Sequence, residues 1–175
     1  MPTIILPKTL HVRMLLLMSI LLGVLISITW LLVSVLVSSI LEEYIGRNAL
    51  NVSKAVSLTT VVEQGLLNQT SIKIQNYAES VRKSTGARFV VVGDHEGKRY
   101  SHPVPERIGK FMVGGDNSRA LVDGEAYISK AVGTLGPSMR GKVPVFSDAG
   151  KVIGVKTVPL NETISIITSN YINIL

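Results

Sequence analysis

A long uninterrupted stretch of apolar residues dominates the first quarter of the chain. Residues 14–41, MLLLMSILLGVLISITWLLVSVLVSSIL, contain no charged side chain. A helix rises about 1.5 Å per residue, so this stretch exceeds the roughly 30 Å hydrocarbon core of a bilayer. The apolar region of a secretory signal peptide is shorter, about 7–15 residues, and no small-residue cleavage motif follows Leu41. The pattern therefore predicts a retained transmembrane helix.

The charges that flank the apolar stretch predict its orientation. A lysine, a histidine and an arginine stand within residues 8–13, whereas two glutamates directly follow the stretch. Cytoplasmic flanks of membrane helices are enriched in lysine and arginine. We therefore expect residues 1–13 to be cytoplasmic and residues 42–160 to form an extracytoplasmic domain of a single-pass protein of the cell membrane.

Helical spacing of apolar residues continues beyond the membrane stretch. It predicts a stalk helix that extends the transmembrane helix as far as Leu66 or Leu67. The polar residues 68–71, NQTS, interrupt this spacing. A second amphipathic helix follows, which we expect to end at Gly86. Its apolar stripe consists of Ile74, Tyr77, Ala78 and Val81.

From Ala87 onward the pattern changes to short apolar strands separated by turns that contain glycine. The stretch RFVVVGDHEGKRYSH predicts one hairpin, and VPVFSDAGKVIGVKTV predicts a second. Between them we expect a short helix within DNSRALVDG, capped by Asp116 or Asn117, and a strand within EAYISKAV. About five strands with hairpin connections imply an antiparallel sheet, so the predicted fold class is α+β.

The end of the chain does not continue this pattern. Residues 161–175 mix apolar residues with serine, threonine and asparagine, and they are too short and polar to span a membrane. We expect a C-terminal tail, so that the given chain is anchored in the membrane once.

Composition narrows the chemistry of the extracytoplasmic domain. The net charge is +6, but two of the positive charges, Lys8 and Arg13, precede the membrane helix. The domain lacks the dense basic stripes with interleaved aromatic residues that nucleic-acid binding requires. The sequence contains no cysteine, which excludes disulfides, thiol catalysis and thiolate metal sites. We expect no cofactor, no metal and no nucleic-acid partner.

Several cationic and hydroxyl groups stand where they can form a site for a small anion. Arg99 and His102 lie near the end of the first hairpin, and Arg140 and Lys142 share one face of a later strand. The turn GTLG, residues 133–136, can present backbone N–H groups, and Thr157 places a hydroxyl on an apolar face. Guanidinium, ammonium, imidazole and N–H donors together suit a di- or tricarboxylate. On spacing alone, solvated strand charges remain the alternative.

The same stretches contain the residue types of a hydrolase but not their arrangement. Ser101–His102, Ser138 and Asp94–His95 offer a nucleophile, a base and an acid, yet neither G-x-S-x-G nor H-E-x-x-H is present. We therefore expect no catalytic residue in this chain.

Four short motifs in a fixed order carry a resemblance to a known family. They are R-x-x-H, I-G-K, G-x-L-G and R-G-K, within FVVVGDHEGKRYSHPVPERIGKFMVGGD, ALVDGEAYIS and GTLGPSMRGKVPVFSDAGKVIGV. Over about residues 45–160 the chain resembles the extracytoplasmic sensor domain of the CitA/DcuS family of bacterial histidine kinases. That family senses citrate or four-carbon dicarboxylates. The resemblance implies a PAS-like fold with a five-stranded antiparallel sheet and N-terminal helices.

The resemblance also implies a set of ligand-binding residues. By their match to the family's motifs they are Arg99, His102, Met112, Thr134, Leu135, Arg140, Lys142 and Thr157. Lys142 and Met112 match the citrate branch, because the dicarboxylate branch carries aromatic residues at these two places. Val91 departs from citrate sensors, which can offer a threonine hydroxyl there, and RYSHP is closer to the dicarboxylate branch. Citrate is therefore the preferred ligand, with malate or succinate next.

The resemblance finally implies a role in two-component signal transduction. The family's second membrane helix, cytoplasmic PAS domain and kinase core are absent from these 175 residues, so we expect a sensor fragment that is not itself an enzyme. Receptors of this kind usually pair through the stalk helix, which predicts a homodimer. The alternative is a singly anchored surface binding or adaptor module with no small-molecule ligand.

Overall fold

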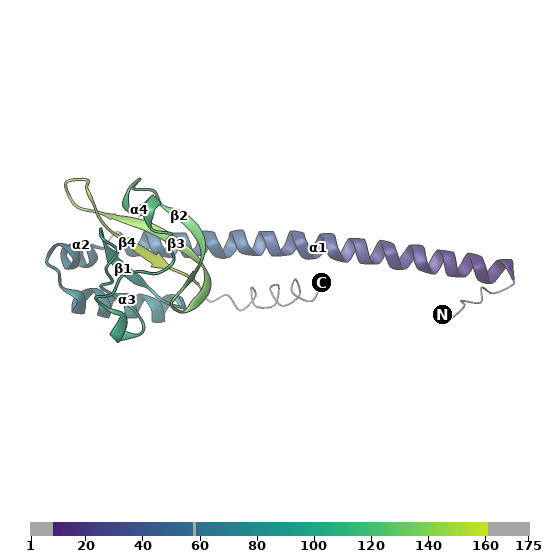
Figure 1. Cartoon of the computed structure of the whole chain (residues 1–175), viewed down its shortest axis with the longest axis horizontal. Coiled ribbons are helices and arrows are strands. Elements are labelled where there is room, and N and C mark those ends of the chain that lie inside the picture. Colours follow the sequence, from purple (N-terminus) through teal and green to yellow (C-terminus); the bar gives the residue numbers. More distant parts are fainter. Residues whose placement is uncertain (1–8, 58, 161–175) are drawn as a thin grey trace. The chain divides into compact units, whose positions relative to one another are not determined.

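The computed structural model describes residues 9–57 and 59–160 (Figure 1). The chain divides into two compact units, Met1–Leu41 and Glu42–Leu175. The helix α1, Leu10–Ser57, contributes to both units. The predicted tail, residues 161–175, and most of the predicted cytoplasmic segment lie outside the described residues.

The first unit is the apolar part of α1. Among the described residues this helix alone is long and apolar enough to cross a membrane. Its large apolar side chains between Leu15 and Leu36 are each at least 42% exposed, as a lipid-facing helix requires. Its hydroxyl groups donate to carbonyls of the preceding turn, for example Ser27 Oγ to Gly23 O at 2.8 Å. These hydroxyl groups need no water in the membrane, because their hydrogen bonds are made within the helix.

The helices of the second unit follow the predicted order with one difference. Helix α1 ends at Ser57, and a separate helix α2, Thr60–Leu67, follows it. The prediction of one continuous stalk helix to Leu66 or Leu67 was wrong. Thr59 adopts an extended conformation, with φ −97° and ψ 123°, and the change of direction buries Val62 and Leu66 in the core.

The second amphipathic helix is present as predicted. Helix α3 spans Ser71–Thr85 and ends at Gly86, whose φ of 67° is the left-handed conformation that glycine adopts without strain. Ile74 and Ala78 of the predicted stripe are buried, and Tyr77 and Val81 pack against the same core.

The strands form one antiparallel sheet. They are β1 (Val91–Asp94), β2 (Tyr127–Gly133), β3 (Gly136–Phe146) and β4 (Val152–Val158), in the order β1-β4-β3-β2. Two short helices, η1 (Pro105–Arg107) and α4 (Ser118–Leu121), lie in the long connection from β1 to β2. The predicted α+β class and PAS-like architecture are confirmed.

The strand count differs from the predicted five, because the segment after β1 is not a regular strand. It makes isolated bridges only, Gly93 to Arg99 and Lys98 to Phe111. Ser101 Oγ instead accepts from Val92 N at 2.8 Å and donates to Val90 O at 3.1 Å. The Ser101 hydroxyl thus bonds two backbone groups, while Tyr100 N donates to Val92 O at 2.7 Å, so the pairing with β1 is too irregular for a fifth strand.

One face of the sheet packs on the helices of the same unit. Ser53 of α1 donates to Gly141 O of β3 at 2.9 Å. A Cβ at Gly141 would lie 2.4 Å from the backbone of Ala49, so only glycine permits this close approach. Because side chains alternate along a strand, the neighbours Arg140 and Lys142 point to the opposite face. The packing of α1 on β3 thereby reserves that face for the site.

A lysine is buried between the sheet and the end of α1. Lys156 of β4 is fully buried, and its Nζ donates to Val56 O at 2.7 Å. Val56 lies in the last turn of α1, where carbonyl groups lack intrahelical partners. Burial lowers the pKa of Lys156 to about 7.

Replacing Lys156 should change how stability depends on pH. The pKa of an unfolded lysine is about 10.4, so between pH 7 and 10 the unfolded chain binds more protons than the folded chain, and stability rises with pH. We expect Lys156 to contribute a rise of about 2 kcal/mol in the free energy of unfolding from pH 7 to pH 9, and Lys156→Met to remove this contribution.

Urea titration of the full chain in detergent, followed by near-ultraviolet circular dichroism, measures the slope of this free energy with pH. Lys151→Met, at an exposed lysine of the β3–β4 turn, is the matched control and should retain the native slope. An unchanged slope in Lys156→Met would contradict the burial of a titrating lysine at this position.

Candidate functional site

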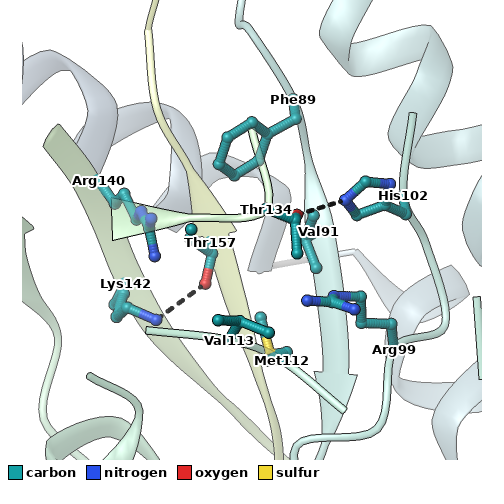
Figure 2. A pocket seen from close by; sticks show the side chains of 11 residues that line it. Phe89, Val91, Arg99, His102, Met112, Val113, Thr134, Arg140, Lys142 and Thr157 are labelled. Carbon is teal, nitrogen blue, oxygen red and sulfur yellow. Dashed lines mark hydrogen bonds between the residues drawn. The ribbon is translucent and has the colours of Figure 1, made fainter. Parts of the chain in front are cut away.

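A cavity opens on the face of the sheet that is turned away from α1 (Figure 2). Its empty volume is about 320 Å³, a figure that includes solvent space at its open mouth. Its lining combines three cations with apolar and hydroxyl side chains: Phe89, Val91, Arg99, His102, Met112, Val113, Gly133, Thr134, Arg140, Lys142 and Thr157. The structure therefore brings together all but one of the residues predicted to bind ligand.

The exception is Leu135. It lies in the turn between β2 and β3 beside Thr134, and its carbonyl oxygen accepts a hydrogen bond from the guanidinium of Arg88. Its side chain does not line the cavity, so its predicted role as a backbone donor stays a prediction.

The middle of the site is a row of residues across three strands. The register pairs Val91 of β1 with Thr157 of β4, and Thr157 with Lys142 of β3. Thr157 and Lys142 are almost completely buried, and Lys142 Nζ donates to Thr157 Oγ1 at 3.4 Å. The row places one hydroxyl between apolar Val91 and cationic Lys142 on the cavity floor.

Arg140 is held in place by its own sheet. Its Nε donates to Ser138 Oγ at 2.8 Å, and its NH2 donates to Ala131 O at 2.9 Å. Gly133 makes room for it, since a Cβ there would lie 2.5 Å from NH2. Arg140 Nη1 makes no hydrogen bond with a described residue and can face an anion. The guanidinium is therefore oriented before any ligand arrives.

Asp116 already faces Arg140 and Lys142. Its Oδ1 lies 3.5 Å from Arg140 NH1 and 3.3 Å from Lys142 Nζ, and its Oδ2 accepts from Ser129 Oγ at 2.6 Å. Burial would raise the pKa of Asp116, but the Ser129 hydrogen bond and the two cations outweigh burial and lower it. Asp116 is therefore an ionised carboxylate inside the site.

From the sequence, Asp116 was predicted to cap a helix, and its contact with Arg140 and Lys142 was not predicted. Asn117 does occupy the N-cap position of α4, but neither residue makes a side-chain cap hydrogen bond in the described structure. Asn117 Oδ1 instead accepts from Lys142 Nζ. The sequence signal for a cap, Asp-Asn before a short helix, is the same whether these side chains cap the helix or bind a distant lysine.

The opposite end of the cavity carries Arg99, and no carboxylate faces it. The backbone N–H of Arg99 donates to Lys110 O at 3.0 Å, and a bridge to Gly93 fixes the segment beside β1. The side chain is 5% exposed, and within residues 9–57 and 59–160 its guanidinium has neither an ion pair nor a hydrogen bond. Burial, and secondarily the charge of Arg107, lower its pKa. Arg99 is a buried cation without a counter-ion.

His102 stands beside Arg99 and is neutral. Gln75 of α3 clamps its backbone, accepting from His102 N at 2.9 Å and donating to His102 O at 3.0 Å. Its Nδ1 lies 3.0 Å from Val104 N and 3.2 Å from Val104 O, and its Nε2 lies 3.2 Å from Thr134 Oγ1, so the tautomer decides which ring nitrogen donates. Burial, then the charge of Arg99, lower the pKa of His102 to about 4.

Gln75 is a contributor to the site that sequence reasoning missed. It lies on α3 and reaches the backbone of a residue far along the chain. Glutamine on an exposed helix face carries no signal of such a contact. Its two hydrogen bonds attach the Arg99–His102 segment to the helical layer.

The arrangement is suited to binding rather than catalysis. Figure 2 shows Arg140 and Lys142 on one side of the cavity and Arg99 and His102 on the other, with Thr157 and Val91 between them. The hydroxyl of Ser101 is occupied by Val90 and Val92, and that of Ser138 by Arg140, so neither is activated by a base. In the described part of the chain no cluster of histidine, aspartate or glutamate could hold a metal ion. Cations on two sides of a cavity favour a ligand with anionic groups at both ends.

The protonation of His102 can be measured directly. We expect the ring signals of His102 in the ligand-free protein to titrate with a midpoint of about 4, because burial opposes the charged form. Nitrogen-15 NMR of the full chain in detergent, with His102→Gln to assign the signals, measures the midpoint and the tautomer. A midpoint near 6.5 would show that His102 is solvated.

Comparisons with known proteins agree with this geometry. The profile of the family described as single cache domain 3 matches residues 36–164. The chain is 56% identical over 119 residues to the sensor protein CitS of Halalkalibacterium halodurans, a match that covers 67% of this chain and 22% of CitS. It is 32% identical over 135 residues to the sensor histidine kinase CitA of Klebsiella pneumoniae, covering 77% of this chain and 24% of CitA. The match thus spans about a quarter of the length of these relatives.

A solved structure supports the same relationship. The crystal structure of the Escherichia coli DcuS sensor domain superimposes with a TM-score of 0.66 and 32% sequence identity, covering 74% of this chain and 97% of that domain. Sequence and fold therefore agree: the chain belongs to the single cache domain 3 family, and its second unit is a sensor domain of the CitA/DcuS type.

Proposed function

We propose that the second unit is the extracytoplasmic receptor for a small di- or tricarboxylate in a two-component sensor. The observation that carries this proposal is Arg99, a buried guanidinium with no counter-ion in the described structure. A buried charge is costly unless it is paired, so a site that keeps one is suited to an anion from outside. A carboxylate accepts two parallel hydrogen bonds from a guanidinium.

The second cationic end limits the shape of the ligand. Arg140 and Lys142 lie on β3, across the cavity from Arg99 and His102 (Figure 2). A ligand with one carboxylate can satisfy one end only, whereas a di- or tricarboxylate can bind at both. Thr157 and Thr134 add hydroxyl groups for a ligand hydroxyl or a further carboxylate oxygen.

Lys142 favours citrate among such ligands, with malate or succinate next. Its ammonium is a third cation, in addition to Arg99 and Arg140, and citrate has a third carboxylate. Burial lowers the pKa of Lys142 to about 8, against the attraction of Asp116, so the group is still mostly protonated at pH 7. An aromatic residue at this position would remove that charge and leave a site suited to two carboxylates.

The fold offers a route from the ligand to the helix α1. Thr157 of β4 faces the cavity, while its neighbour Lys156 faces the other way and binds Val56 O at the end of α1. A ligand that draws β3 and β4 towards Arg99 would therefore also shift the contact with α1. In this proposal the N-terminus is cytoplasmic, the receptor is outside, and two chains pair through α1, so that ligand binding shifts the population of two states.

Truncation of Arg99 tests the receptor function. We expect the full chain in detergent to bind citrate, and Arg99→Ala to weaken binding at least tenfold, because a charge-assisted hydrogen bond contributes about 1.5–3 kcal/mol. Isothermal titration calorimetry with citrate, malate and succinate measures the affinities.

Lys151→Ala, which removes an exposed positive charge from the β3–β4 turn, is the control and should bind like the native chain. If the native chain binds none of the three carboxylates below about 1 mM, the alternative of an adaptor module without a small-molecule ligand is favoured. Equal loss in both variants would indicate a general charge effect.

Replacement of Lys142 tests the ligand class. Lys142→Phe should lower the affinity for citrate about tenfold or more relative to succinate, because the charge that pairs with the third carboxylate is lost. Lys142→Arg keeps the charge and should preserve the order of preference. Titration of both variants with both ligands gives the ratio, and an unchanged ratio in Lys142→Phe would refute the assignment to citrate.

A further inference from the structure

The cationic end of the site on β3 already has an anion of the protein beside it. Lys142 Nζ donates to Asn117 Oδ1 and Thr157 Oγ1, and its charge is paired with Asp116 Oδ1 at 3.3 Å. Arg140 uses Nε and one N–H of Nη2 on Ser138 and Ala131, and its Nη1 lies 3.5 Å from Asp116 Oδ1.

At the Arg99 end, by contrast, the cation is not paired with a carboxylate of the described residues. Its guanidinium has no anionic partner in the described structure, and the neighbouring His102 is neutral. The two ends therefore differ in what a ligand meets on arrival. A carboxylate can pair with Arg99 directly, but at the other end it meets a carboxylate in place.

We propose that Asp116 is a specificity-determining residue of the site, an internal carboxylate that occupies the Arg140–Lys142 end until a ligand carboxylate takes its place. This inference rests on the proposed function. If Asp116 occupies one end of the site, the number of carboxylates on the ligand decides whether Asp116 has to move.

With Asp116 in place, three cations and one carboxylate leave two net positive charges, which matches a dicarboxylate. Once Asp116 has moved away, the three cations match a tricarboxylate. Displacement costs free energy, so Asp116 lowers the affinity for every ligand that binds at this end. It lowers the affinity for citrate most, because citrate requires all three charges.

The carboxylate of Asp116 occupies the place of a ligand carboxylate, and only one of its two oxygens is hydrogen-bonded within the described part of the chain. Oδ2 has a good hydrogen bond, from Ser129, but Oδ1 is buried without a hydrogen bond from any described residue and is attracted only by charge. A carboxylate from a ligand can approach the same cations with better geometry. The exchange is therefore favourable for a ligand that also binds Arg99.

The loop that carries Asp116 is shaped by two glycines and held by Tyr127, whose Oη donates to Asp116 O. Gly114 and Gly115 precede it with φ of 129° and 66°, conformations that side chains other than glycine rarely adopt. A Cβ at Gly114 would lie 2.7 Å from Asp116 Oδ1 and 3.1 Å from Arg140 NH1, so glycine also allows the carboxylate to reach the arginine. Val113, directly before them, is 56% exposed.

The test compares Asp116→Asn with Asp148→Asn in the full chain in detergent. Both substitutions raise the net charge equally, but Asp148 lies exposed in the β3–β4 turn. We expect Asp116→Asn to increase the affinity for citrate about tenfold and that for succinate by a smaller factor, as calorimetry measures, and Asp148→Asn to change neither. Ser129→Ala, which frees Oδ2, should raise the citrate affinity about threefold. It provides the same test if Asp116→Asn does not fold.

A second readout needs no ligand. If Asp116 pairs with Lys142 in solution, its negative charge raises the pKa of Lys142. Asp116→Asn removes that charge, so the pKa of Lys142 should fall below the value of about 8 in the native chain. Carbon-13 NMR of lysine, assigned with Lys142→Arg, follows this pKa.

The outcomes separate this inference from the proposed function. Tighter citrate binding in Asp116→Asn, or binding in this variant alone, supports the inference. Native binding that weakens or stays equal in Asp116→Asn overturns it and leaves the proposed function standing, because Asp116 would then only position the two cations. An unchanged pKa of Lys142 overturns it as well. Absence of binding in every variant overturns both.

Discussion

The burial of three cations around one cavity is the constraint on which the rest of this domain depends. Arg99, Arg140 and Lys142 are each at most 5% exposed. Their mutual repulsion and lost hydration cost free energy, and only an anion can offset this cost. Asp116 supplies that anion at the β3 end, and no carboxylate does so at the Arg99 end in the described structure. The folded domain therefore keeps one buried cation, Arg99, that an external anion can neutralise.

Because side chains alternate along β3 and β4, the cations can line the cavity on one face of the sheet while the other face packs in the core. On one face, Gly141 brings β3 against the backbone of α1, and Lys156 caps the end of that helix. On the other face, Lys142 and Thr157 form the cavity floor. Because the two faces belong to the same strands, the cavity floor and the packing against α1 are mechanically connected.

Part of this arrangement could be predicted because it depends on local patterns. The alternation of Arg140 and Lys142 on one face, the hairpin of β3 and β4, and the end of α3 at Gly86 each follow from spacing of a few residues. The break between α1 and α2 was missed, since Thr59 differs little from its neighbours in helix preference. The irregular segment after β1 was missed because a serine hydroxyl that bonds the backbone of Val90 and Val92 leaves no periodic signal.

The sequence by itself determined the membrane helix, the α+β class and most of the residues that line the cavity, because periodicity and motif order are properties of neighbouring residues. Tertiary structure alone decided how these charges are balanced. It turned Asp116 from a helix cap into a partner of Arg140 and Lys142, and it attached Gln75 of a distant helix to His102. Such pairings depend on which strands and loops meet in space, and electrostatic attraction between residues far apart along the chain has no period that a sequence can display.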